Sequence, residues 1–190
     1  MSLNIEIERQ ITQSSDVFAE IRLKCSESMN EAAQMMIERI QKGNKILWCG
    51  NGGSAAQAQH LSTELVGGLR DHNRKAIPSI SLTTDSSFLT AWSNDTNFAS
   101  IFSRQIEALG QEGDVLIGIS TSGNSENVFL AIKKAQAMGI HTILFTGKDG
   151  GKINDRADIT IFIPSDDTQR IQEGHILCGH ILCEMVEKSF

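Results

Sequence analysis

The stretch KILWCGNGGSAAQAQHLSTELV, residues 45–66, decides the fold of this 190-residue chain. It begins with a short apolar run, 45–49, which is typical of a strand buried in a sheet. The glycine-rich segment 50–53 ends that run, and Ser54 opens an alanine-rich segment that predicts a helix through about Val66. A strand that leads through a glycine loop into a helix is typical of the start of a βαβ unit.

The same unit recurs along the rest of the chain. Further strands are predicted at 77–82, 114–120, 141–146 and 158–164. Helical segments follow them, around 86–93, 97–109, 126–138 and 168–188. Strands that alternate with helices pair in parallel through right-handed crossovers. The sequence therefore predicts an α/β fold, a doubly wound five-stranded parallel sheet flanked by helices.

Residues 1–43 predict an N-terminal helical extension ahead of the α/β part, which spans 44–190. Apolar residues form an irregular face in the first helix and recur at spacings of three and four from Met29 to Ile40. Gly43-Asn44 ends the second helix. No linker or low-complexity tract divides the chain, so residues 1–190 are predicted to form a single domain.

Composition and charge narrow the classes of partner. The formal net charge is −6, which disfavours a nucleic-acid surface built on Lys and Arg contacts to phosphates. A small phosphorylated ligand stays compatible with this charge, because backbone N–H groups can bind an anion locally. The opening residues, MSLNIEIERQ, do not resemble a secretory signal, and no apolar stretch is long enough to span a membrane. We expect a cytoplasmic protein without a nucleic-acid or membrane partner.

The four cysteines, at positions 25, 49, 178 and 183, form no CxxC pair. This spacing disfavours a zinc ribbon or a thioredoxin-type motif. Three of the four lie in apolar runs, where a free thiol behaves as a small hydrophobic side chain. We expect buried, reduced cysteines rather than ligands.

The segment STSGNS, residues 120–125, ends one predicted strand and precedes a predicted helix. Its hydroxyls and successive backbone N–H groups can surround a phosphate, and the dipole of the following helix favours an anion there. In a doubly wound sheet, ligands bind beyond the carboxyl ends of the strands, where this segment lies. A simple turn with an N-cap needs only one serine, so we interpret the segment as a phosphate-binding loop.

Two pairs of polar side chains stand at helical spacings. His60 and Glu64 lie four residues apart, on one face of the helix that follows the glycine loop. Gln172 and His180 share a face of the last helix, two turns apart, whereas His175 points elsewhere and is interpreted as a structural or surface residue. An imidazole with a carboxylate can bind a divalent metal or transfer protons. Taken alone, the spacing of His60 and Glu64 favours an exposed charge pair over a functional site, because such surface pairs are common.

The combination of motifs resembles the phosphoheptose isomerase family of SIS (sugar isomerase) domain proteins. The resemblance covers nearly the whole chain and is loosest in residues 1–40. Five strings carry it: CGNGGSAAQAQHLSTELVGG (49–68), SND (93–95), GDVLIGISTSGNSENV (113–128), FTGKDGG (145–151) and RIQEGHILCGHILC (170–183). It implies one SIS domain that converts sedoheptulose 7-phosphate to D-glycero-D-manno-heptose 7-phosphate through an enediol. That step opens bacterial heptose biosynthesis.

The resemblance also implies roles for particular residues. Glu64 would be the general base and His180 the general acid. One zinc ion per subunit would be held by His60, Glu64, Gln172 and His180. The residues implied to contact substrate are Asn51, Gly52, Gly53, Glu64, Asn94, Asp95, Ser120, Thr121, Ser122, Ser125 and Gln172. The assembly implied is a homotetramer in which residues 1–43 take part.

An alternative function is that of a binding protein rather than an enzyme. A related SIS protein that binds the bacterial replication initiator resembles this chain at the glycine loop, the Asn-Asp pair and the RIQE segment. That relative lacks the acid–base pair, whereas Glu64 and His180 are both present here. An intact acid–base pair favours the enzyme.

Overall fold

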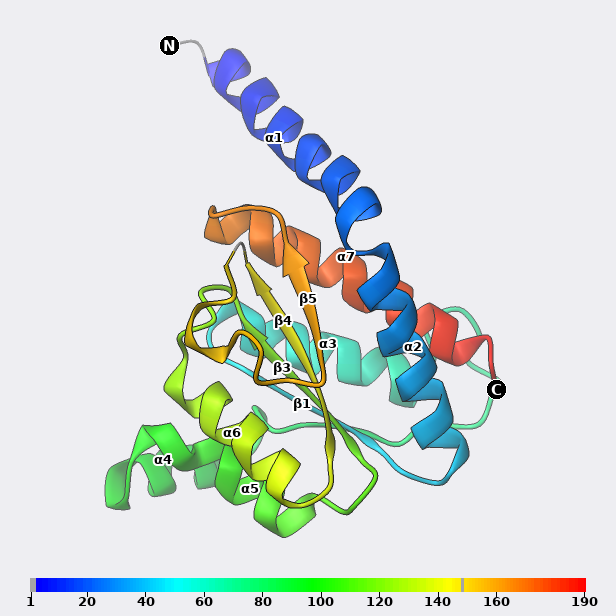
Figure 1. Cartoon of the computed structure of the whole chain (residues 1–190), viewed down its shortest axis with the longest axis vertical. Helices are drawn as coiled ribbons and strands as arrows, with labels where there is room; N and C mark the ends of the chain where they lie inside the picture. The colour runs from blue at the N-terminus through cyan, green and yellow to red at the C-terminus, as the bar shows by residue number, and fades with distance from the viewer. Residues whose placement is uncertain (1–2, 148) are drawn as a thin grey trace.

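The computed structural model describes residues 3–147 and 149–190 (Figure 1). It contains a five-stranded sheet with the order β2-β1-β3-β4-β5, in which all neighbours pair in parallel. The strands are β1 (Ile46–Gly50), β2 (Ser79–Ser81), β3 (Val115–Ser120), β4 (His141–Gly147) and β5 (Ile159–Ile163). The predicted doubly wound parallel sheet is confirmed.

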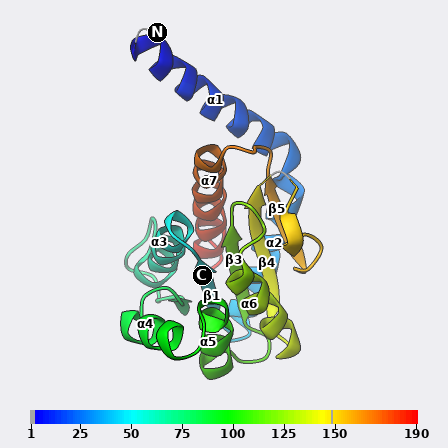
Figure 2. The ribbon, with the colours of Figure 1, turned by 90° about the vertical axis from the view of Figure 1, so that its left-hand side faces the viewer.

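Helices cover both faces of the sheet (Figure 2). One face carries α2 (Ser26–Gln41), α3 (Gly53–Gly67) and α7 (Thr168–Glu187). The other carries α4 (Ser86–Asp95), α5 (Ile101–Leu109) and α6 (Glu126–Ala137). Short 3₁₀ turns, η1 (Phe98–Ser100) and η2 (Gly151–Ile153), lie before α5 and after β4.

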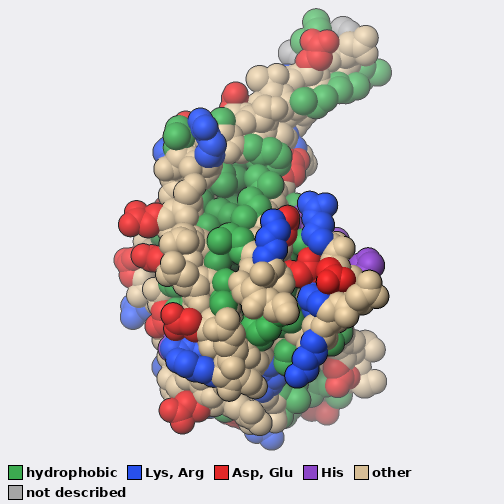
Figure 3. All heavy atoms as spheres, turned by 90° about the vertical axis from the view of Figure 1, so that its right-hand side faces the viewer, with side chains coloured by type: hydrophobic (Ala, Val, Ile, Leu, Met, Phe, Trp, Pro, Cys, Tyr) green, Lys and Arg blue, Asp and Glu red, His purple; other side chains and the backbone are tan. Residues whose placement is uncertain are grey.

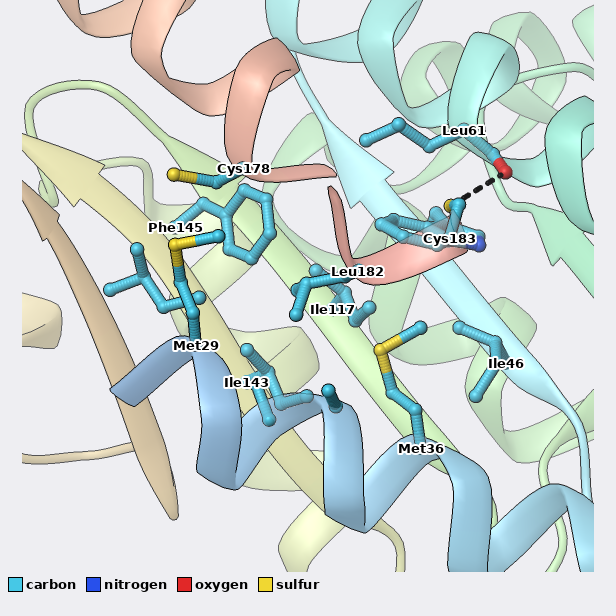
Figure 4. Close-up of a cluster of buried hydrophobic side chains, with 14 of the residues drawn as sticks. Met29, Met36, Ile46, Leu61, Ile117, Ile143, Phe145, Cys178, Leu182 and Cys183 are labelled. Atoms are coloured by element: carbon cyan, nitrogen blue, oxygen red, sulfur yellow. Dashed lines mark hydrogen bonds between the residues drawn. The ribbon is translucent and has the colours of Figure 1, made fainter. Parts of the chain in front are cut away.

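The alternation of side chains along the buried strands produces two cores. Ile46 and Trp48 of β1 point into the core beneath α2, α3 and α7, and Leu47 and Cys49 point to the other face. Figure 4 shows the first core, where Met36 of α2 and residues of α7 pack over the strands. Both faces of β1 are covered, which explains why its sequence is continuously apolar.

The two N-terminal helices differ in burial. In α2 a buried stripe faces the sheet: Met29, Ala32, Ala33, Met36 and Ile40. Helix α1 (Leu3–Lys24) projects from the body, and only Ile21 is buried. Large apolar side chains remain exposed along it: Leu3, Ile5, Ile7, Ile11, Phe18 and Leu23. Figure 3 looks at the right-hand side of Figure 1 and shows hydrophobic side chains along α1 and on the body of the molecule below it.

The cysteines behave as predicted, since all four are free and buried. Burial raises the pKa of the Cys49 and Cys178 thiols to about 12, so they stay protonated at neutral pH. Within residues 3–147 and 149–190, no helix combines the length and apolar character needed to cross a bilayer.

The strand order places the functional loops together. The chain reverses its direction of winding between β1 and β3, which lie side by side. The segment 50–53, called the glycine loop below, follows β1, and the segment 120–125, called the serine loop, follows β3. Ligands of doubly wound sheets bind at this switch point.

Candidate active site

Three titratable side chains converge where α3 meets α7. His60 and Glu64 come from α3 and His180 from α7; we call them the acid–base cluster. His60 Nε2 lies 2.7 Å from His180 Nε2 and 3.1 Å from Glu64 Oε1. The side chain of His60 is 49% exposed, so a ligand can reach the cluster from solvent. Residues 120 positions apart in the sequence thus form one reactive group.

The two helices approach closely because small residues lie at their contact. A Cβ atom added to Gly179 would come within 2.6 Å of Leu61 Cδ2. Any larger side chain at Gly179 would therefore push α7 away from α3. The Cys183 thiol donates to the Leu61 carbonyl over 3.7 Å, one turn further along (Figure 4). This contact sets the separation between His60 and His180.

A buried ion pair supports the far end of α3. Arg74 Nε donates to Glu187 Oε1 over 2.9 Å, and both side chains are 5% exposed. Arg74 Nη2 also donates to the carbonyls of Glu64 and Leu65, which satisfies two acceptors near the end of α3. The pair therefore holds the backbone that carries Glu64.

Glu187 also organises the loop that follows α3. Its carboxylate accepts hydrogen bonds from the backbone N–H groups of Leu69, Arg70 and Asp71. Burial alone raises the pKa of this carboxyl, but the hydrogen bonds from Arg74 and the backbone outweigh it and lower the pKa. Glu187 is thus ionised at neutral pH and ties this loop to α7.

Gln172 lies in the first part of α7, two turns before His180. A Cβ atom added to Gly53 would lie 2.5 Å from Gln172 Nε2, so the Gln172 amide packs against the glycine loop. The backbone carbonyl of Gln172 accepts a 2.6 Å hydrogen bond from Gln57 Nε2 of α3. The structure brings three of the four predicted metal ligands together and places the fourth beside the glycine loop.

The glycine loop turns sharply against β3. A Cβ atom on Gly50 would lie 2.9 Å from the Ser54 carbonyl oxygen and 3.0 Å from that of Ile119, so only glycine fits there. Gly52 and Gly53 are exposed at the start of α3. Asn51 is half-buried, and its amide pairs with that of Asn127.

The serine loop leads into α6, with Ser125 at the N-cap position. Ser120 is buried and donates to Ser125 Oγ over 3.0 Å. Ser122 is exposed, and its hydroxyl accepts from the Asn124 N–H. A cavity of about 240 Å³ opens on Thr121 and Ser122. The loop therefore offers hydroxyls and the N-terminal end of α6 to an anion.

Asn94 and Asp95, the predicted substrate contacts from the SND string, lie on a different helix from the acid–base cluster. They end α4, on the face of the sheet opposite α3 and α7, and both are exposed. The Asn94 amide donates to Asp95 Oδ1 over 2.8 Å. Within the described part of the chain, neither has a recorded hydrogen bond to the acid–base cluster or to either loop. The contact of this pair with substrate stays a prediction.

The acid–base cluster has the chemistry of a metal site. Its candidate ligand atoms, two imidazole nitrogens and a carboxylate oxygen, all lie within 4.8 Å of one another. Three protein ligands of this type with an open position are typical of catalytic zinc. The residues present therefore fit a zinc ion.

Sequence reasoning missed three supporting side chains: Gln57, Arg74 and Asn127. Each acts through a hydrogen bond to a residue far away in the sequence: Gln57 to Gln172, Arg74 to Glu187 and Asn127 to Asn51. Gln57 and Asn127 lie inside strings that carry the resemblance, and Arg74 lies outside all of them. Arg74 and Gln57 carried no spacing signal that pointed to their partners.

The chain resembles known proteins over nearly its whole length. The SIS domain pattern matches residues 11–147. The phosphoheptose isomerase of Clostridium acetobutylicum is 52% identical over 163 residues, which cover 86% of this chain and 83% of that protein. The solved structure of the Neisseria gonorrhoeae phosphoheptose isomerase matches with a TM-score of 0.91 at 41% identity, over 98% of this chain and 100% of that one. The structure of the Francisella tularensis phosphoheptose isomerase matches with a TM-score of 0.95 at 34% identity, over 99% and 100%.

Proposed function

The chain belongs to the phosphoheptose isomerases of the SIS domain family, and we propose that it converts sedoheptulose 7-phosphate to D-glycero-D-manno-heptose 7-phosphate. The observation that carries the proposal is the acid–base cluster, in which the His60 imidazole contacts both the His180 imidazole and the Glu64 carboxylate. Isomerisation of a ketose to an aldose needs such groups, because one proton must leave carbon and another must return.

In the proposed mechanism Glu64 is the general base. Its carboxylate removes a proton from the carbon next to the substrate carbonyl, which produces an enediol. One carboxylate oxygen faces His60 Nε2, and a carboxylate has a second oxygen with which to accept the proton. His180 is the general acid that protonates the carbonyl oxygen in the same step. The enediol becomes the aldose when Glu64 returns its proton to the neighbouring carbon and His180 takes back the proton of the terminal hydroxyl.

Zinc is the proposed cofactor, with His60, Glu64 and His180 as ligands and Gln172 as a further ligand and substrate contact. The donor set of two nitrogens and one carboxylate oxygen supports this choice. A bound zinc ion would supply a Lewis acid that polarises the carbonyl and hydroxyl oxygens of the sugar. The Arg74–Glu187 pair would keep the ligand helix in place through the carbonyl of Glu64.

The proposed substrate lies along the switch point between β1 and β3. The phosphate is proposed to bind the serine loop through Thr121, Ser122, Ser125 and the buried Ser120. The sugar would extend past Asn51, Gly52 and Gly53 towards Glu64 and His180. The closeness of Gly53 to Gln172 supports this path, because it joins the glycine loop to the helix that carries His180.

A homotetramer is part of the proposal. Helix α1 leaves apolar side chains exposed over most of its length, and such patches are typical of protein interfaces. The cavity at the serine loop, about 240 Å³, is smaller than the ~300–1,000 Å³ of a typical ligand site. A second chain that presents Asn94 and Asp95 would complete the site. Light scattering on the purified protein measures its molar mass in solution, and therefore its oligomeric state.

The proposed location is the cytoplasm, where the phosphorylated sugars of heptose biosynthesis are made. The alternative of a non-catalytic SIS protein that binds the replication initiator predicts no turnover. The converging geometry of Glu64 and His180 favours the enzyme, because a binding protein has no use for an acid and a base at one point.

The test mixes the purified protein with sedoheptulose 7-phosphate, with and without added zinc, and follows the anomeric protons of the aldose by NMR. Growth of the heptose 7-phosphate signals, with loss of activity in a chelator and recovery with zinc, is the expected result. A folded protein that binds the sugar phosphate but forms no product under any metal condition would support the binding protein instead.

A further inference from the structure

The glycine loop and the serine loop are joined by a reciprocal pair of amides. Asn51 Nδ2 donates to Asn127 Oδ1, and Asn127 Nδ2 donates back to Asn51 Oδ1, each over 2.8 Å. Asn51 belongs to the glycine loop, and Asn127 lies in the first turn of α6, two residues after the serine loop. The pair therefore connects segments that lie 76 residues apart in the sequence.

Each amide fixes the orientation of the other. If either side chain rotated by half a turn about its last bond, N–H would face N–H and oxygen would face oxygen. Asn127 is only 3% exposed, so an unpaired amide there would lose hydrogen bonds that water cannot replace. Asn51 is half-buried and keeps one N–H and one lone pair outside the pair.

The backbone around Asn51 leaves this amide little freedom. Gly50 lies in contact with Ser54 on one side and with the Ile119 carbonyl on the other. Ile119 immediately precedes the serine loop on β3. The glycine loop thus meets β3 through the backbone at Gly50, and one residue later it meets α6 through the Asn51 side chain.

We propose that Asn127 is a positioning residue, which orients the Asn51 amide and sets the spacing between the two loops that bind the sugar phosphate. It does not touch substrate itself, because its side chain is buried and its amide is engaged with Asn51. This inference rests on the proposed function, from which it takes the identity of the ligand. It adds a residue that acts on binding through Asn51, not on proton transfer.

The test is a double-mutant cycle with Asn51→Ala, Asn127→Ala and the combined variant. KM for sedoheptulose 7-phosphate and the dissociation constant of the same sugar phosphate, measured by calorimetry, are the readouts. We expect Asn127→Ala to raise both constants about tenfold and to leave kcat within about twofold. We expect the combined variant to resemble Asn51→Ala alone, because Asn127 acts only through Asn51.

Two further variants guard against a general loss of structure. Asn127→Asp keeps the shape of the side chain, yet its carboxylate cannot donate to Asn51 Oδ1, so it should reproduce the rise in both constants even if Asn127→Ala folds poorly. Gln105→Ala removes a buried amide of α5 that donates to the Leu82 and Ile101 carbonyls, away from both loops. It should leave KM and the dissociation constant unchanged.

Three results would overturn the inference: unchanged constants in both Asn127 variants, a combined variant about tenfold worse than Asn51→Ala, or an equal rise in Gln105→Ala. Failure of the proposed function is a separate result, in which the unmodified protein binds the sugar phosphate without turnover. In that case KM cannot be measured, and the double-mutant cycle is evaluated from the dissociation constants alone. A protein that binds no sugar phosphate would overturn both proposals.

Discussion

The acid–base cluster and the serine loop are built in opposite ways. The serine loop is one continuous segment, and its hydroxyls and backbone N–H groups are near one another because they are near in sequence. The acid–base cluster joins His60 of α3 to His180 of α7, and only the packing of those helices brings them to 2.7 Å. The first region depends on local conformation, and the second depends on a distant core contact.

This difference has a consequence for mutation. A change inside the serine loop should weaken binding and leave the chemistry intact. A change in the core between α3 and α7 should disturb the chemistry even though it lies outside the reactive groups, because the separation of the helices sets the distance between the imidazoles.

The largest expected effect comes from Glu64→Gln. The amide is nearly the same shape but is not a base, so kcat should fall by about 10²–10⁴-fold, while the protein stays folded. Steady-state kinetics with the sugar phosphate measures this. Glu112→Gln, at the amino-terminal end of β3, is the control and should keep normal kcat. Near-normal turnover by the Glu64 variant would remove it as the base.

Helix α7 also carries a histidine that contrasts with His180. His175 is fully buried, 5.7 Å from the Phe145 ring between centroids, and the Thr146 backbone opposes the effect of burial on its pKa only in part. Burial lowers its pKa from 6.5 to about 4. Between these values the unfolded chain takes up a proton that the folded chain refuses, so the free energy of unfolding should fall by on the order of 3 kcal/mol as the pH falls.

His175→Leu should remove that part of the pH dependence. Urea unfolding at a series of pH values between 6.5 and 4 measures the difference between the variant and the unmodified protein. The exposed His72, changed to Gln, serves as the control and should keep the original pH dependence. Parallel curves for the His175 variant and the unmodified protein would contradict the role of burial.

Gly179→Ala tests the dependence of the cluster on helix packing. The added methyl group meets Leu61 in a full core, so we expect a loss of about 1–3 kcal/mol in the free energy of unfolding. We also expect lower kcat and weaker zinc binding, with little change in phosphate affinity. Gly67→Ala is the matched control, since a Cβ atom there meets nothing within 4 Å. Equal losses of zinc and phosphate affinity would break the distinction between the two regions.

The smallest expected effect comes from the serine loop. Ser120→Ala combined with Ser122→Ala removes two hydroxyls and should raise KM about tenfold, with kcat nearly unchanged. Ser103→Ala, which removes a hydroxyl of α5 bonded to a backbone carbonyl, is the control. An unchanged KM in the double variant would mean that this segment is a turn and no more.

Much of the fold was predictable because it follows from short-range patterns. All five strands lie within about two residues of their predicted bounds, since each is an apolar run ended by glycine or polar residues. The break between η1 and α5 and the turn η2 were not predicted. Both lie in segments whose conformation depends on side-chain hydrogen bonds, such as that of Asn97 to the Ser100 N–H.

The sequence by itself determined the parallel α/β sheet, the glycine and serine loops, and the shared face of His60 and Glu64. Periodicity and loop composition act over a few residues, so they can be read without the fold. Only the tertiary structure decided that His180 meets His60, that Arg74 and Glu187 hold the end of α3, and that Asn127 pairs with Asn51. These contacts join residues 76 to 120 positions apart. Their geometry comes from close packing of helices and strands, which no local pattern encodes.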